Sequence, residues 1–154
     1  MATKKILVPY NFTANDERAI DLVIQNFSRH PDARITLFHA YLPVPNIEIS
    51  DKTVMSRISG NLSYLRQKIT DLEAEIVKAR DRLIDAGFSK ERVNYIFKPQ
   101  SNDASQEIID QAIGGEFTGI VLNRSPASIR RFFTPSVSKR VVKALQHLEL
   151  FMVG

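Results

Sequence analysis

Short apolar segments alternate with longer amphipathic segments along the chain. Five short segments are rich in aliphatic, β-branched or aromatic side chains, which is typical of strands: residues 6–8, 34–41, 93–98, 119–122 and 148–153. Between them, apolar residues recur every three or four positions, as on one face of an amphipathic helix. This alternation predicts an α/β fold with one open parallel sheet, helices on both faces and right-handed crossovers.

Capping and turn residues mark the ends of the predicted helices. Thr13, followed three residues later by Asp16, is expected to cap the first helix. A short helix over residues 103–113 offers apolar side chains for packing, Ile113 among them, and a Gly-Gly pair closes it. Pro135 suits the first turn of the last helix, because its fixed φ is already helical.

The longest apolar repeat predicts a long helix between the second and third strands. Its apolar positions alternate steps of three and four without an error: Met55, Ile58, Leu62, Leu65, Ile69, Leu72, Ile76, Ala79 and Leu83. Residues 61–86 alone would measure about 39 Å, against a domain width of roughly 38 Å. We expect this helix to span the face of the sheet or to project slightly past it. Alternatively, the repeat is a partner-binding seam, although its flanking charges give no clear rule for pairing.

Length and composition indicate a single domain over residues 1–154. The chain is 44% hydrophobic and 25% charged with 6 glycines and 7 prolines, which argues against long disorder. It contains no cysteine, which excludes disulfides and thiolate chemistry, and its three histidines are too scattered to indicate a metal site. No apolar run is long enough for a membrane span, and the N-terminus has no apolar signal core, so a cytoplasmic location is expected.

The formal net charge of +4 is concentrated near the C-terminus. Residues 1–119 hold 15 basic and 16 acidic side chains, whereas residues 120–154 hold 6 basic side chains and one acidic side chain, a net charge of +5. Such a segment can serve an anion site or a nucleic acid. Because the chain has no recognised nucleic-acid motif and no base-stacking aromatic platform, the anion site is favoured.

The predicted topology places a candidate crevice at the C-terminal ends of the first and fourth strands. Open parallel sheets bind ligands beyond strand ends where the strand order reverses, which happens here if the first strand is central. The N-terminus of the last helix, with its free backbone donors, would face the same crevice. The candidate residues for an anion or nucleotide are Pro9, Tyr10, Asn11, Asn123, Arg124, Ser125, Arg130, Arg131, Ser136 and Val137.

Three segments, in order along the chain, resemble the universal stress protein family. The opening KKILVPYNFT is similar to the family's first strand, which commonly ends in VPVDFS. ARITLFHAY is similar to its second strand, and IVLNRSPASIRRFFTPSVSKRV to its segment from the fourth strand into the last helix. The resemblance implies the strand order 3-2-1-4-5 and a cytoplasmic homodimer, often joined by pairing of the last strands, here residues 150–153.

The departures from the family bear on function. ATP-binding members carry an aspartate at the end of the first strand and a loop Gly-x2-Gly-x9-Gly-Ser/Thr, whose glycines let the backbone wrap phosphates. Asn11 stands at the aspartate position. The glycine positions hold Leu122, Ser125 and Pro135, or, with a gap of one residue, Asn123 and Pro126 for the first two. Proline lacks an N–H donor, so the chain is expected to follow the branch without the nucleotide motif.

These observations favour a non-enzymatic stress-response protein, a homodimeric binding or regulatory module with a degenerate nucleotide site and an unknown protein partner. No nucleophile, base and orienting acid occur at a credible spacing, so no catalytic residue and no resident metal or cofactor are assigned. The alternative is an ATP- or AMP-binding switch in which Arg124, Arg130 and Arg131 replace the glycine loop. Asn11 is expected to shape a turn, and His39 to be a core or edge residue.

Overall fold

The computed structural model describes residues 3–44, 52–123 and 135–153. Its strands form one parallel sheet in the order β3-β2-β1-β4-β5. They are β1 (Lys4–Pro9), β2 (Ala33–Tyr41), β3 (Val93–Pro99), β4 (Gly119–Asn123) and β5 (Glu149–Val153). The predicted five-stranded sheet and its order are therefore confirmed, with β1 at the centre.

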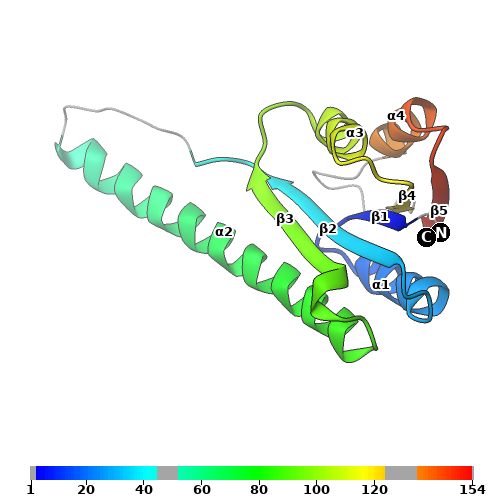
Figure 1. The fold of residues 1–154 in the computed structure, drawn as a ribbon. Coiled ribbons are helices and arrows are strands. Elements are labelled where there is room, and N and C mark those ends of the chain that lie inside the picture. Colours follow the sequence, from blue (N-terminus) through cyan, green and yellow to red (C-terminus); the bar gives the residue numbers. More distant parts are fainter. Residues whose placement is uncertain (1–2, 45–51, 124–134, 154) are drawn as a thin grey trace.

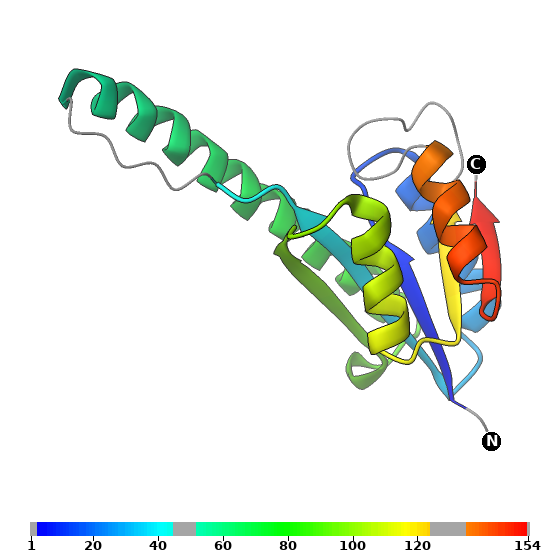
Figure 2. The same cartoon turned by 90° about the horizontal axis from the view of Figure 1, so that it is seen from above.

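Helices cover both faces of the sheet (Figures 1 and 2). One face carries α1 (Asn15–Phe27) and α2 (Lys52–Asp85), and the other carries α3 (Ala104–Gly114) and α4 (Pro135–Ala144). A short 3-10 helix, η1 (Lys90–Arg92), leads into β3. The first two crossovers lead from β1 outward to β2 and β3 over one face, and the next two lead back past β1 to β4 and then outward to β5 over the other. The direction of winding therefore reverses between β1 and β4.

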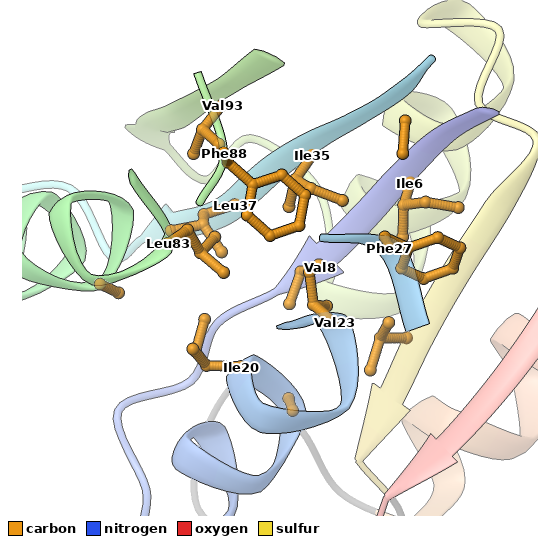
Figure 3. Packing of buried hydrophobic residues seen from close by; sticks show 14 of the residues in the cluster. Ile6, Val8, Ile20, Val23, Phe27, Ile35, Leu37, Leu83, Phe88 and Val93 are labelled. Atoms are coloured by element: carbon orange, nitrogen blue, oxygen red, sulfur yellow. The ribbon is translucent and has the colours of Figure 1, made fainter. Parts of the chain in front are cut away.

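The central strand β1 is buried on both faces. Ile6 and Val8 face α1 and α2, while Leu7 between them faces α3 and α4, because successive side chains of a strand point to opposite faces. Figure 3 shows the first of these cores, in which side chains from three strands meet those of both helices. Its fully buried members include Ile6, Val8, Ile20, Val23, Ile35, Leu37, Ile76, Leu83 and Phe88.

Helix α2 ends in the cap that its sequence predicts. Gly87 has φ of +122°, in the left-handed region that favours glycine. The N–H of Phe88 donates to the carbonyl of Leu83 at 3.2 Å, and the N–H of Gly87 donates to that of Ile84 at 3.1 Å. These are the two bonds of a Schellman motif, and the ring of Phe88 turns back into the core.

Helix α2 projects far beyond the sheet, more than its sequence suggested. Ile76, Ala79 and Leu83 are buried against the sheet, whereas Leu65 of the same apolar repeat is 39% exposed. Figures 1 and 2 show the N-terminal part of α2 extending past the ends of β2 and β3. The expectation that the helix spans the sheet or projects only slightly past it is wrong, because the sheet is shorter than the 34-residue helix.

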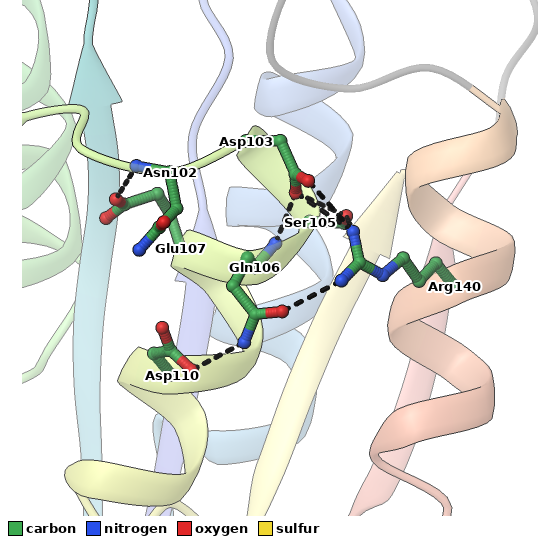
Figure 4. Close-up of polar contacts among 7 residues, drawn as sticks. All are labelled: Asn102, Asp103, Ser105, Gln106, Glu107, Asp110 and Arg140. Atoms are coloured by element: carbon green, nitrogen blue, oxygen red, sulfur yellow. Dashed lines mark hydrogen bonds and ion pairs between the residues drawn. The ribbon is translucent and has the colours of Figure 1, made fainter.

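The loop before α3 is organised by a buried carboxylate. Glu107 is 2% exposed and accepts the backbone N–H of Asn102 at 2.9 Å (Figure 4). It also accepts the backbone N–H of Ser101 at 2.9 Å, and its carboxylate lies 3.3 Å from Nζ of Lys98. Burial raises the pKa of Glu107, but these bonds outweigh it and hold that pKa below its ordinary value. The sequence was wrong about one packing residue of α3, since Ile113 is 56% exposed.

Replacing Gly87 by alanine should destabilise the protein by about 1–2 kcal/mol, because an L side chain is strained at this φ. Gly60→Ala is the matched control. Gly60 lies within α2 with open space where the methyl group of an alanine would lie, so the same change should stabilise the protein by up to about 1 kcal/mol. Urea denaturation of both variants measures the difference, and equal effects at the two positions would contradict this assignment of the cap.

Candidate functional site

Six of the ten predicted crevice residues are described, and they lie where β1 and β4 end or at the start of α4. β1 and β4 are neighbours, with Ile6 beside Gly119 and Leu7 beside Ile120, so their C-terminal residues Pro9 and Asn123 end at the same edge. Tyr10 and Asn11 follow β1 directly, and Ser136 and Val137 lie in the first turn of α4. Arg124, Ser125, Arg130 and Arg131 lie outside the described residues.

Asp16 organises the loop between β1 and α1. Its carboxylate is 3% exposed and accepts the backbone N–H of Thr13 at 2.8 Å and that of Asn11 at 3.3 Å. The prediction that Thr13 caps α1 is wrong: Ala14 is the N-cap, and the Thr13 hydroxyl donates instead to Oδ1 of Asn11 at 3.0 Å. In the predicted cap, a loop side chain would accept a helix N–H group. In the structure, the side chain of a helix residue, Asp16, instead accepts N–H groups of the loop.

Asn11 itself shapes the turn, as expected from its position after a strand. Its side chain is 9% exposed, and Oδ1 is occupied by the Thr13 hydroxyl. Its Nδ2 is buried without a hydrogen-bond acceptor. Asn11 therefore leaves a buried NH2 group without an acceptor at the end of β1, in place of a carboxylate.

Phe12 has a backbone conformation that is rare for a residue with a side chain. Its φ is +63°, in the left-handed region, which costs about 1–3 kcal/mol unless surrounding contacts hold it. The bonds of Asp16 to the residues on either side supply such contacts. The Phe12 ring also packs edge-on against Tyr10 at 5.0 Å and against His39 at 4.7 Å between centroids.

His39 is a buried, hydrogen-bonded core residue, as its sequence position predicted. Its side chain is 8% exposed, and Nδ1 lies 2.8 Å from the carbonyl oxygen of Tyr10, which assigns the proton to Nδ1. Burial lowers the pKa of His39 to about 4, although the bond to Tyr10 opposes this shift. The ring is therefore neutral at pH 7.

The end of β1 has a negative electrostatic environment. Burial raises the pKa of Asp16 to about 6, and the N–H groups of Thr13, Asn11 and Phe12 lower it only partly. Asp16 is thus ionised at pH 7. The pKa of Tyr10 rises to about 12, first through burial and then through the carboxylates of Asp16, Glu75 and Glu17. Tyr10 consequently keeps its proton at any physiological pH.

A hollow of about 570 Å³ opens beside this loop, between it and α2. Its lining residues are Tyr10, Phe12, Thr13, Ala14, Glu17, Leu72 and Glu75. Aromatic surface and two carboxylates therefore face the space next to the candidate crevice. An uncharged ring would suit these walls better than a phosphate, which the carboxylates would repel.

Part of the C-terminal positive charge stabilises the fold. Arg140 of α4 contacts Asp103, the N-cap of α3, at 3.0 Å, and also bonds to Ser105 at 2.7 Å and to Gln106 at 2.8 Å (Figure 4). The pKa of Asp103 is lowered first by the backbone N–H of Gln106, then by the hydroxyl of Ser105 and the guanidinium of Arg140. Arg140 therefore joins α3 to α4. Of the six basic residues near the C-terminus, this one binds side chains of the protein itself and does not support an anion site.

Comparison with known proteins places the fold. No protein-family model and no curated protein sequence matches the chain. Solved structures do match it: universal stress protein UspA from Lactobacillus plantarum has a TM-score of 0.63 at 15% identity, covering 100% of both chains. A universal stress protein from Archaeoglobus fulgidus in complex with dAMP has a TM-score of 0.64 at 13% identity, covering 99% of this chain and 98% of that one. Another universal stress protein, in complex with cAMP, has a TM-score of 0.64 at 14% identity, covering 100% of this chain and 98% of that one.

These matches show that the chain has the universal stress protein fold, as its sequence segments suggested. In the described ranges, no group of three or more histidine or acidic side chains is placed to hold a metal ion. No helix within those ranges has both the length and the apolar character of a membrane span.

Sequence reasoning missed the roles of Asp16 and Phe12 at the end of β1. The sequence pattern presents Asp16 as part of a capping signal, yet its helical phase relative to Ala19, Ile20 and Val23 places it on the buried face. That phase is the available signal for a buried carboxylate. The left-handed conformation of Phe12 has no signal, because neither glycine nor asparagine marks that position.

Asp16 and His39 should have opposite effects on the pH dependence of stability. Between pH 4 and 6, Asp16 is protonated in the folded state and ionised in the unfolded state, so its contribution falls as pH rises. His39 is neutral when folded and protonated when unfolded, so its contribution rises with pH. The two slopes largely cancel in the wild type.

A substitution at either position should reveal the pH dependence of stability that the other residue contributes. Relative to the wild type, Asp16→Asn should gain stability as pH rises from 4 to 6, by up to about 1.4 kcal/mol per pH unit, and His39→Asn should lose it at a similar rate. Urea denaturation at several pH values measures both. Parallel pH profiles for all three proteins would contradict the assigned shifts.

Proposed function

We propose that this protein is a non-enzymatic stress-response protein of the universal stress protein type, which works in the cytoplasm as a homodimeric binding or regulatory module with a degenerate nucleotide site. The class is supported by the shared fold and by the ordered resemblance of three sequence segments. The degenerate nucleotide site is proposed because the loop after β1 has few free backbone N–H groups and an unfavourable potential for a phosphate.

The observation that carries the proposal is the use of loop amides by Asp16. Phosphate sites at strand ends depend on free backbone N–H groups. Here the N–H groups of Asn11 and Thr13 already donate to a buried carboxylate of this chain. That carboxylate is ionised at pH 7, so the loop offers a phosphate neither these donors nor a favourable potential.

The β4 side of the crevice gives the same indication. Sequence positions at which ATP-binding members carry glycine hold residues with side chains, and Pro135 has no N–H to donate. Glycine is needed in such loops because it allows close backbone approach to the ligand. The side chains at the glycine positions, together with Pro135, favour a site that no longer offers its backbone N–H groups to a phosphate.

An alternative function is nucleotide binding of a different kind. Universal stress proteins with similar folds have been solved with cAMP and with dAMP. The uncharged rings of Tyr10 and Phe12 line the adjacent hollow and offer contacts for a base, and the nearby Nδ2 of Asn11 is buried without an acceptor. In this version the phosphate would be held by the side chains of Arg124, Arg130 and Arg131, in place of the glycine loop.

Dimerisation through β5 is supported by the sheet order. β5 lies at one edge, where it pairs with β4 on one side only, so its outer N–H and C=O groups can pair with a second copy. Phe151 and Met152 remain partly exposed there. A two-fold pairing of β5 with β5 would join two sheets into one.

Calorimetric titration should separate the two functions. With ATP, AMP, cAMP or dAMP plus magnesium, the wild type should show no saturable heat, because the loop amides are already occupied. Stoichiometric binding in the micromolar range would overturn the degenerate site. In that event, equal binding by wild type and by Arg130→Ala with Arg131→Ala would also contradict the arginine mechanism.

Met152→Lys should weaken dimerisation at least about tenfold, because two cationic side chains would meet across the paired edge strands. Ile113→Lys is the matched control, since it adds the same charge at an exposed position on α3. Sedimentation equilibrium measures both, with thermal melting to confirm folding. A wild type that stays monomeric at tens of micromolar would contradict the dimer.

A further inference from the structure

The N-terminal part of α2 extends beyond the body of the protein. We define this arm as residues 52–68 of α2, which measure about 25 Å at 1.5 Å per residue. Figure 2 shows that no other described helix or strand runs beside most of its length.

Exposed apolar side chains gather on the arm and at its base. The described part of the chain has four large exposed hydrophobic residues, and three of them are Tyr64 at 69%, Leu65 at 39% and Leu42 at 70% exposure. Leu62, Leu65, Ile69 and Leu72 follow one another in steps of three and four, which places them on one stripe of the helix. The same repeat continues into the residues that pack on the sheet.

The stripe leads into a hollow of about 460 Å³ at the base of the arm. Its lining residues are Tyr41, Pro43, Val44, Arg66, Ile69, Thr70 and Pro99. Arg66 is the one charged residue among them, so the surface is mostly apolar. A helix lying along the stripe would thus find a recess for an apolar side chain beside Ile69.

The charge of the arm indicates which kind of partner could bind along the stripe. Residues 52–69 contain four basic side chains, Lys52, Arg57, Arg66 and Lys68, and no carboxylate. Arg66 and Lys68 flank the apolar stripe, next to Leu65 and Ile69 respectively. The positive end of the helix dipole has the same sign. Two arms paired along residues 52–69 would bring only basic groups together, since the first carboxylates that flank the stripe, those of Asp71 and Glu73, lie beside Leu72 at its end, and this disfavours a second copy.

We propose that the arm is a docking surface for an acidic amphipathic helix of another protein, whose apolar face covers the stripe and whose carboxylates pair with Arg66 and Lys68. Helix pairs of this kind bury apolar seam positions and select partners through flanking charges. The arm lies on the β3 side of the sheet, away from β5, so dimerisation through β5 would not cover it.

Two synthetic peptides test the charge requirement on the full-length protein. Each is about four heptads long with leucine at the seam positions, and the flanking positions hold glutamate in one peptide and lysine in the other. Fluorescence anisotropy should show that the glutamate peptide binds at least about tenfold more tightly. No binding, or equal binding of the two peptides, would overturn the proposal.

Variants of the arm locate the site. Arg66→Glu with Lys68→Glu should weaken the glutamate peptide at least about tenfold. Arg29→Glu with Lys90→Glu makes the same charge change at exposed positions remote from the arm and should leave its binding unchanged. Leu62→Ala with Leu65→Ala should abolish binding while circular dichroism and the melting temperature stay near wild type, because Leu65 is already partly exposed. Peptide binding that survives both arm variants would place the site elsewhere.

Two further measurements distinguish other occupants. Sedimentation equilibrium of Leu62→Ala with Leu65→Ala should match that of the wild type, and a loss of self-association would show that a second copy covers the arm instead. Vesicles containing phosphatidylserine should not compete with the glutamate peptide. Tight, arm-dependent vesicle binding that exceeds peptide binding would replace the proposal with a membrane surface.

Discussion

Burial of both faces of the parallel sheet is the constraint on which the rest of the structure depends. A parallel sheet needs helices on each face, and its crossovers are right-handed, so the chain must wind outward on one face and return on the other. This makes β1 central and puts the reversal between β1 and β4. The candidate crevice is a consequence of that winding, because it lies where the two crossovers from neighbouring strands diverge.

In the proposed function, the end of β1 keeps its place in the fold while its chemistry differs from that of a phosphate site. A buried carboxylate from the helix accepts the loop amides that an anion would otherwise use. An aromatic cluster of Tyr10, Phe12 and His39 covers the strand end. Their burial keeps His39 neutral, and the ionised Asp16 leaves the loop negative at pH 7. The site is therefore better suited to an uncharged group than to a phosphate.

Helix α2 carries one continuous apolar repeat but meets two environments. Its C-terminal part packs on the sheet through Ile76, Ala79 and Leu83, and its N-terminal part leaves Leu65 and Tyr64 exposed. The sequence cannot divide the helix, since the spacing of apolar residues is the same in both parts. The division comes from the length of β2 and β3, whose C-terminal ends lie near Ile69.

The sequence by itself determined the sheet, its helices and the glycine cap after α2, because these follow from local periodicity and from the backbone freedom of single residues. It also brought Pro9, Tyr10, Asn11 and Asn123 to one edge, since that needs only the order of elements. Tertiary structure alone decided that Asp16 binds the loop amides, that Arg140 joins α3 to α4, and that α2 projects. Those outcomes depend on which side chains meet across the fold, and no local pattern encodes such distances.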